Sequence, residues 1–180
     1  MYDGKLSGFP AWNKLYKRSI FENIEFPKGR IYEDAAIMYR LFSNANKIIY
    51  LDFPLYNYIH RESSITRSKF SEKRFDAALN YKEAYSYMEK NQPEICEKLD
   101  SIYFTTLRSM IVDIIHERSI FKNYKYISEI SKLIRNNNKK IIKNNMVSLK
   151  HKILAQFLAW CPILGLFFYK ILFLKYNFEK

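Results

Sequence analysis

Residues that break helices are scarce in this chain, which has four glycines and five prolines among 180 residues. The long periodic segments rich in Ile, Leu, Lys and Glu therefore favour helices over a sheet-rich domain. An apolar fraction of 48% argues against a disordered chain, and the length is sufficient for a hydrophobic core. The sequence predicts a folded chain of the α+β class that is mostly helical.

Cysteine is also scarce, and the two cysteines, Cys96 and Cys161, lie far apart in the sequence. They form no C-x-x-C pair and have no histidine at ligand spacing, which argues against a cysteine-ligated metal site and a disulfide framework. The first ten residues lack the basic and then apolar pattern of a secretory signal. We therefore expect a reduced, cytoplasmic location.

Acidic residues are nearly missing from the last third of the chain. Residues 122–180 contain 12 Lys/Arg and 2 Asp/Glu, whereas residues 1–121 contain 18 and 16. This asymmetry predicts a surface that meets anions, either phospholipid or nucleic acid. Most of the 15 tyrosines lie outside the basic third, so aromatic and basic residues do not interleave and we expect no nucleic-acid partner.

The chain divides into three zones by pattern, residues 1–70, 71–145 and 146–180. The first mixes short apolar runs with turn residues, and β-branched and aromatic residues predict short strands at 47–52 and 54–60. The second shows helical periodicity and forms the predicted helical extension.

Within the helical extension, Asn91-Gln92-Pro93 predicts a break after the first helix. A later helix is expected over 126–142, and the Lys/Asn-rich segment 135–145 is expected to fray.

The most apolar stretch is 153–174, which would just cover a bilayer core of ~30 Å. Gln156, Pro162, Gly165 and Lys170 interrupt it, so two short helices hinged at Cys161-Pro162 fit better than one span. Flanking lysines favour helices at an anionic membrane surface, while burial within the fold and a true span stay open. We expect a peripheral position on the inner face of the cell membrane.

Two adjacent acids, Glu33 and Asp34, stand where a helix with an apolar stripe begins. Counting back by three and four from Met38 and Leu41 places Asp34 on the buried face, at the open end of the helix. Asp34 could cap the helix or favour its positive N-terminal dipole. A carboxylate partly screened from water also suits a general base, and position alone does not decide between these interpretations.

Three motifs occur in order: AWNKLYKRSIF (11–21), FPKGRIYEDAAIMYRLF (26–42) and KIIYLDFPLYNYIHRESSIT (47–66). In this order and at these separations they resemble the second half of the catalytic domain of family 2 glycosyltransferases. The similarity is greatest to bacterial enzymes that build capsular and other surface polysaccharides. It covers roughly residues 9–90, with a weaker similarity in the helical tail.

The resemblance implies the acceptor-side half of a GT-A fold, followed by an α-helical tail. It also implies an inverting transfer of a sugar from a nucleotide-sugar donor to a lipid-linked glycan acceptor in surface polysaccharide synthesis. Asp34 corresponds to the catalytic base, and Glu33 would position the acceptor or Asp34.

The resemblance also assigns substrate-binding roles to four other residues, and a simpler structural role is open for several of them. Trp12 would offer a flat face to a sugar ring, or pack in a core. Lys14 would face the donor diphosphate, or be solvated. His60 and Arg61 match a loop that closes over the nucleotide, where Arg61 suits a diphosphate leaving group. His60 could ligate a metal but has no second ligand nearby.

The chain also departs from the family pattern. It contains no D-x-D motif and no glycine-rich phosphate loop. The family implies a divalent metal, Mg²⁺ or Mn²⁺, whose main ligands are absent from this chain, so no metal-binding residue is assigned. We expect a missing N-terminal half to supply the nucleotide site, and the chain alone to be inactive. The alternative is a non-catalytic module that interacts with membrane surfaces.

Overall fold

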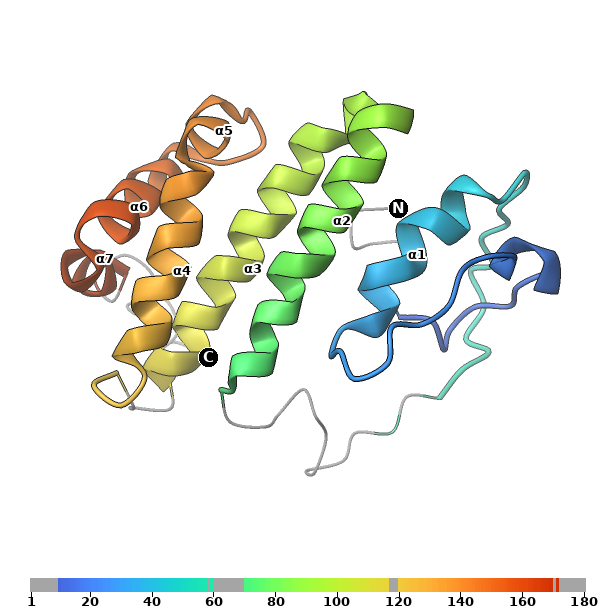
Figure 1. Ribbon diagram of the computed structural model, residues 1–180, viewed down its shortest axis with the longest axis horizontal. Coiled ribbons are helices and arrows are strands. Elements are labelled where there is room, and N and C mark those ends of the chain that lie inside the picture. The colour runs from blue at the N-terminus through green and yellow to red at the C-terminus, as the bar shows by residue number, and fades with distance from the viewer. Residues whose placement is uncertain (1–9, 58, 60–69, 117–119, 170, 172–180) are drawn as a thin grey trace. The chain divides into compact units, whose positions relative to one another are not determined.

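The protein is described by a computed structural model that covers residues 10–57, 59, 70–116, 120–169 and 171 (Figure 1). The chain divides into two compact units, with the boundary between Pro93 and Glu94. Helices are the only regular secondary structure that the described residues form. The division of the sequence into the zones 1–70, 71–145 and 146–180 stays a prediction.

The first unit contains two α-helices that lie side by side, α1 (Glu33–Ser43) and α2 (Asp76–Asn91) (Figure 1). Short 3₁₀ turns, η1 (Arg18–Phe21) and η3 (Glu72–Phe75), precede them. The buried residues of α1 form the predicted apolar stripe, and together with Ile24 they make the core of this unit. Its buried members are Ile24, Ala36, Ile37, Met38 and Leu41, and Ala11, Tyr16, Ile20, Phe21 and Phe42 pack against them.

The two predicted strands are not found among the residues that the structure describes. Residues 47–52 and the described part of 54–60 carry no strand, while 58 and 60 lie outside the described residues. A strand is stable only when its backbone N–H and C=O groups pair with a neighbour. The β-branched and aromatic composition predicted two strands, but among the described residues no neighbouring strand is present to pair with them.

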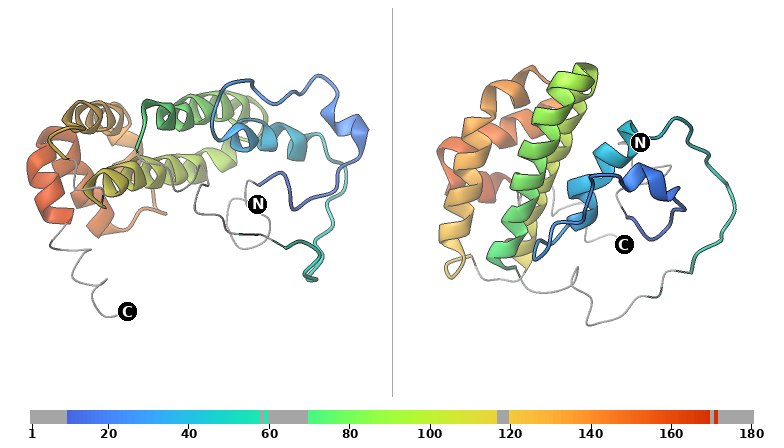
Figure 2. Two further views of the ribbon diagram at one scale, coloured as in Figure 1. Left: turned by 90° about the horizontal axis from the view of Figure 1, so that it is seen from below. Right: turned by 45° about the vertical axis from the view of Figure 1, so that its right-hand side comes forward.

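The second unit is a bundle of five helices in its described part: α3 (Cys96–His116), α4 (Tyr124–Asn136), α5 (Asn138–Lys143), α6 (Leu149–Trp160) and α7 (Pro162–Tyr169). Helices α3 and α4 run antiparallel, α6 packs against α4, and α7 folds back on α6 (Figures 1 and 2). Long aliphatic side chains fill the space between these helices. The fully buried ones include Leu107, Ile111, Ile114, Ile127, Ile130, Ile134, Leu154 and Leu158.

The predicted break after α2 is confirmed, because α2 ends at Asn91 and a short 3₁₀ turn, η4 (Pro93–Ile95), leads into α3. The expected helix over 126–142 is instead two helices, α4 and α5, with Asn137 between them.

The prediction that segment 135–145 frays is wrong, since asparagine side chains fix it to its neighbours. Asn138 and Gln156 exchange two hydrogen bonds of 3.2 and 2.6 Å. Asn144 donates to the Glu97 carbonyl at 2.6 Å. Ile141 is buried between these contacts. The polar composition therefore serves tertiary hydrogen bonds that a local pattern does not reveal.

The apolar stretch that begins at residue 153 forms two helices, as predicted, and Cys161 separates them. None of the helices in the described residues has the length and apolar character needed to cross a membrane. Helices α6 and α7 approach each other closely at Gly165. A Cβ atom at this position would lie 2.7 Å from Leu158 Cδ2 and 2.8 Å from the Leu158 backbone nitrogen.

We predict that Gly165→Ala destabilises the chain by about 1–3 kcal/mol, because a methyl group would have to displace backbone atoms as well as a side chain. Leu164→Ala is the control, since Leu164 is the exposed neighbour on the same helix. The free energy of unfolding from urea titration checks both variants. Equal stability of Gly165→Ala and the wild type would show that the two helices are not packed this closely.

Candidate functional site

Helix α1 begins with an uncommon backbone conformation. Its N-cap residue, Tyr32, has φ 60° and ψ 36°, and Gly29 three residues earlier has φ 81°. The left-handed region is open to glycine but costs a residue with a side chain roughly 1–2 kcal/mol. No side chain caps the first turn of α1. Other contacts must therefore hold residues 30–32 in place.

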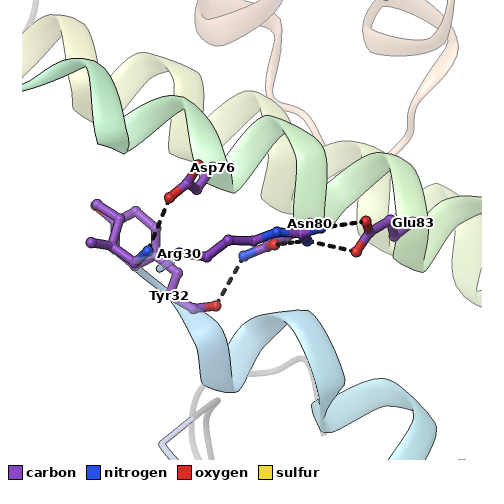
Figure 3. Close-up of polar contacts among 6 residues, drawn as sticks. Arg30, Tyr32, Asp76, Asn80 and Glu83 are labelled. Atoms are coloured by element: carbon purple, nitrogen blue, oxygen red, sulfur yellow. Dashed lines mark hydrogen bonds and ion pairs between the residues drawn. The ribbon is translucent and has the colours of Figure 1, made fainter. Parts of the chain in front are cut away.

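Those contacts come from one face of α2, where Asp76, Asn80 and Glu83 are spaced by four and three residues (Figure 3). We call these three residues the α2 clamp. Asp76 accepts a hydrogen bond of 2.9 Å from the Ile31 backbone N–H. Asn80 donates to the Tyr32 carbonyl at 2.9 Å. The clamp thus binds the backbone on both sides of the left-handed turn.

The clamp also binds the Arg30 side chain. Arg30 donates to both carboxylate oxygens of Glu83, at 2.8 and 2.9 Å, and to Asn80 Oδ1 at 3.2 Å (Figure 3). The hydrogen bonds between the two side chains raise the pKa of Arg30 and lower the pKa of Glu83. Asn80 is only 4% exposed, and it uses both its amide nitrogen and its amide oxygen in these contacts.

Asp34 lies in the first turn of α1 and is partly buried. Its Oδ1 accepts a hydrogen bond of 2.7 Å from the Ala35 N–H. Because Tyr32 is the N-cap residue, the interpretation of Asp34 as the cap is wrong, although a carboxylate in the first turn still favours the helix dipole. Glu33 is exposed beside it.

The surroundings of Asp34 make it a stronger base than an ordinary aspartate. Desolvation by burial raises its pKa, the Ala35 N–H opposes this rise, the Glu33 charge adds to it, and Lys14 opposes it. Burial in turn lowers the pKa of Lys14, against the attraction of Asp34. Burial and the Asp34 charge both raise the pKa of Tyr16. Lys14, Tyr16 and Asp34 therefore form one electrostatic cluster.

The predicted positions fall into separate groups. Lys14 lies in the Asp34 cluster, and its Nζ donates to the Pro10 carbonyl at 2.5 Å and to Asn13 Oδ1 at 2.6 Å. Trp12 is 45% exposed, so it is not a core residue. Its ring centroid lies 4.5 Å from that of Tyr56, with the planes tilted by 31°. His60 and Arg61 lie outside the described residues.

Sequence reasoning missed the α2 clamp and the partners Tyr16 and Tyr56. The clamp had a detectable signal, because Asp76, Asn80 and Glu83 form a polar stripe on one face of a predicted helix. Nothing local indicated that this stripe would bind residues 30–32.

Within the described ranges, no group of three or more His, Cys, Asp or Glu side chains is arranged to hold a metal ion. The divalent metal that the family resemblance implies stays a prediction.

Three curated proteins are similar to parts of this chain. Glycosyltransferase GlyG and glycosyltransferase GlyA, both of Streptococcus pneumoniae serotype 4, are each 39% identical over 57 residues, 32% of this chain. EpsH of Bacillus subtilis, provisionally named a glycosyltransferase, is 33% identical over 120 residues, 62% of this chain.

The matched parts are small relative to these proteins: 19% of GlyG, 8% of GlyA and 33% of EpsH. The chain thus spans a third or less of the length of each relative. No family model matches the sequence. No solved structure matches it either. The comparisons show partial similarity to glycosyltransferases.

Proposed function

We propose that this chain carries the acceptor-side part of an inverting glycosyltransferase of family 2 with a GT-A fold, acting in surface polysaccharide synthesis. The observation that carries the proposal is the state of Asp34, a partly buried carboxylate with a raised pKa at a helix start fixed by the α2 clamp. The partial similarity to three proteins named as glycosyltransferases supports the same class of reaction.

In the proposed reaction Asp34 accepts the proton of an acceptor hydroxyl as the hydroxyl oxygen forms a bond to the anomeric carbon of the donor sugar. The bond from that carbon to the nucleotide diphosphate breaks, and the diphosphate leaves with the electron pair. Attack from the opposite side inverts the anomeric configuration. Desolvation assists this role, because it raises the proton affinity of the carboxylate.

The remaining site residues have proposed binding roles. Trp12 and Tyr56 form an exposed aromatic pair on which the apolar face of a sugar ring could stack. Lys14 lies near enough to Asp34 to oppose the rise in its pKa, so it tunes the base. Glu33 is exposed and free to contact the acceptor. By family resemblance, His60 and Arg61 bind the donor diphosphate.

We propose that polypeptide outside these 180 residues binds the nucleotide-sugar and any divalent metal. Eight large apolar side chains between residues 48 and 59 are exposed, including Ile49, Leu51 and Phe53. A run of exposed apolar side chains of this kind is typical of a segment that another polypeptide covers. The length of the relatives is consistent with such additional polypeptide.

The activity test uses Asp34→Asn in a polypeptide that contains these residues together with the donor-binding part. We expect sugar transfer to fall by about 10²–10⁴-fold, since the amide cannot accept the proton. Transfer is measured as nucleoside diphosphate release from a panel of nucleotide-sugars with a lipid extract as acceptor. Donor binding should be unchanged.

Glu25→Gln is the matched control for this experiment, because Glu25 is an exposed carboxylate of the same unit that lies outside the apolar segment 48–59. Turnover by Asp34→Asn within a factor of a few of the control would exclude Asp34 as the base.

The stability of Asp34→Asn separates a functional carboxylate from a structural one. Burial raises the folded-state pKa of Asp34, so the folded state holds the proton more tightly and ionisation at neutral pH destabilises it. Asp34→Asn should therefore raise the free energy of unfolding at neutral pH, by less than about 1 kcal/mol given the partial exposure. This gain in the free energy of unfolding should shrink once the pH falls below the raised folded-state pKa of Asp34. It should vanish below the ordinary aspartate pKa. Urea unfolding of the wild type and Asp34→Asn, at neutral pH and at a pH below the ordinary aspartate pKa, checks this expectation. A lower free energy of unfolding for Asp34→Asn at neutral pH would favour the helix-dipole role.

The α2 clamp provides another test of the site. Asn80→Ala removes two hydrogen bonds, the one to the Tyr32 carbonyl and the one from Arg30, and should cost about 1–3 kcal/mol of stability. In the active polypeptide it should lower kcat more than it raises the donor KM, because it displaces the base and spares the donor site. Glu89→Gln, an exposed change on the same helix, should alter neither quantity. Unchanged kcat in folded Asn80→Ala would show that the clamp does not position the base.

A further inference from the structure

The second unit carries an apolar surface that its own core does not use. On α6, the side chains of Leu149, Ile153, Phe157 and Trp160 recur every three or four residues and are exposed. The buried side chains of the same helix are Leu154, Ala155, Leu158 and Ala159. At about 100° per residue the two sets occupy opposite sides of the helix. Helix α6 is therefore apolar on two faces, and only one of them packs against the unit.

Helix α7 also has exposed apolar side chains on one side. Its buried residues are Gly165, Leu166 and Tyr169, whereas Ile163, Leu164 and Phe167 are exposed on the other side. The two helices are in direct contact, and the ring centroids of Phe157 and Phe168 lie 5.0 Å apart. We call the exposed residues of α6 and α7 the outer face. Seven exposed large apolar side chains on two helices in contact are typical of an interaction site rather than of scattered surface hydrophobicity.

The charged residues of the two helices that carry the outer face are of one sign. Helices α6 and α7 contain Lys150 and Lys152 and no Asp or Glu. Arg135 of α4 donates two hydrogen bonds to the Ala159 carbonyl, at 2.9 and 2.7 Å, and its Cζ lies 5.0 Å from the centre of the Trp160 ring. This pairing fixes a cation beside the most exposed aromatic ring of α6. Lys150 is exposed and follows Leu149 at the other end of the helix.

We propose that the outer face binds the surface of a bilayer that contains anionic phospholipid. Trp and Phe side chains insert at headgroup depth, and Arg135 and Lys150 meet the lipid phosphates. The charge pattern favours this occupant, because a lipid surface offers both an apolar layer and a dense array of negative charge. The proposal concerns the second unit alone and is independent of the role of Asp34.

The experiment measures binding of the whole chain to vesicles of phosphatidylcholine, with or without about one-third phosphatidylglycerol. We expect sedimentation with the anionic vesicles, little with the neutral ones, and release as salt is raised. The double variant Ile163→Ser/Phe167→Ser should bind at least about tenfold more weakly, since it removes exposed apolar area without touching the core. Lys150→Glu should reduce binding to the anionic vesicles.

Matched controls come from the loop between α3 and α4, where Phe121 and Lys122 are exposed. Phe121→Ser and Lys122→Glu make the same chemical changes away from the outer face and should bind like the wild type. Trp12→Phe leaves Trp160 as the only tryptophan, so a blue shift of its emission on vesicles reports insertion directly.

Three results would overturn the proposal. One is equal binding by the wild type and the double variant. Another is absence of the Trp160 blue shift with anionic vesicles. The third is a wild-type dimer that the double variant dissociates and that does not bind vesicles, because the outer face would then be an interface between two copies of the chain.

Discussion

The hydrogen bonds from the α2 clamp to residues 30–32 are the constraint on which the candidate site depends. They hold Tyr32 in a left-handed conformation that a tyrosine does not favour by itself. Tyr32 sets the first residue of α1, and each residue advances a helix by about 100°. A shift of one residue at this start would turn Asp34 away from Lys14 and Tyr16. The hydrogen bonds from Asp76 and Asn80 to the backbone of residues 31 and 32 therefore determine the direction of the Asp34 carboxylate.

The core beneath the site fixes the same carboxylate from the other side. Met38 is fully buried, and the Tyr16 hydroxyl donates to its sulfur at 3.7 Å and to the Ala11 carbonyl at 3.3 Å. Tyr16 thus connects the segment that carries Lys14 with the helix that carries Asp34. The packing that withdraws Asp34 from water is also what raises its pKa. The same burial therefore makes Asp34 a stronger base and slightly lowers the stability of the folded chain at neutral pH.

Features encoded by neighbouring residues were predictable from the sequence. The apolar stripe of α1, the break at Asn91-Gln92-Pro93 and the hinge at Cys161 all follow from periodicity and helix-breaking residues. Features that depend on distant partners were not. The strands at 47–52 and 54–60 require a neighbouring strand, and the order of segment 135–145 depends on contacts with Glu97 and Gln156. The position of Asp34 was predicted, whereas the clamp that fixes it was not.

Two exposed apolar surfaces of this chain differ in charge, and the difference indicates different occupants. Residues 47–59 include one lysine and one aspartate, so this segment of exposed apolar side chains has no net charge. A neutral, β-branched and aromatic segment suits burial against another polypeptide, where unpaired charge would be costly. The helices that carry the outer face, α6 and α7, contain two lysines and no acidic residue. Burial against protein would require matching acids for those cations, whereas a phospholipid surface supplies phosphate beside an apolar layer.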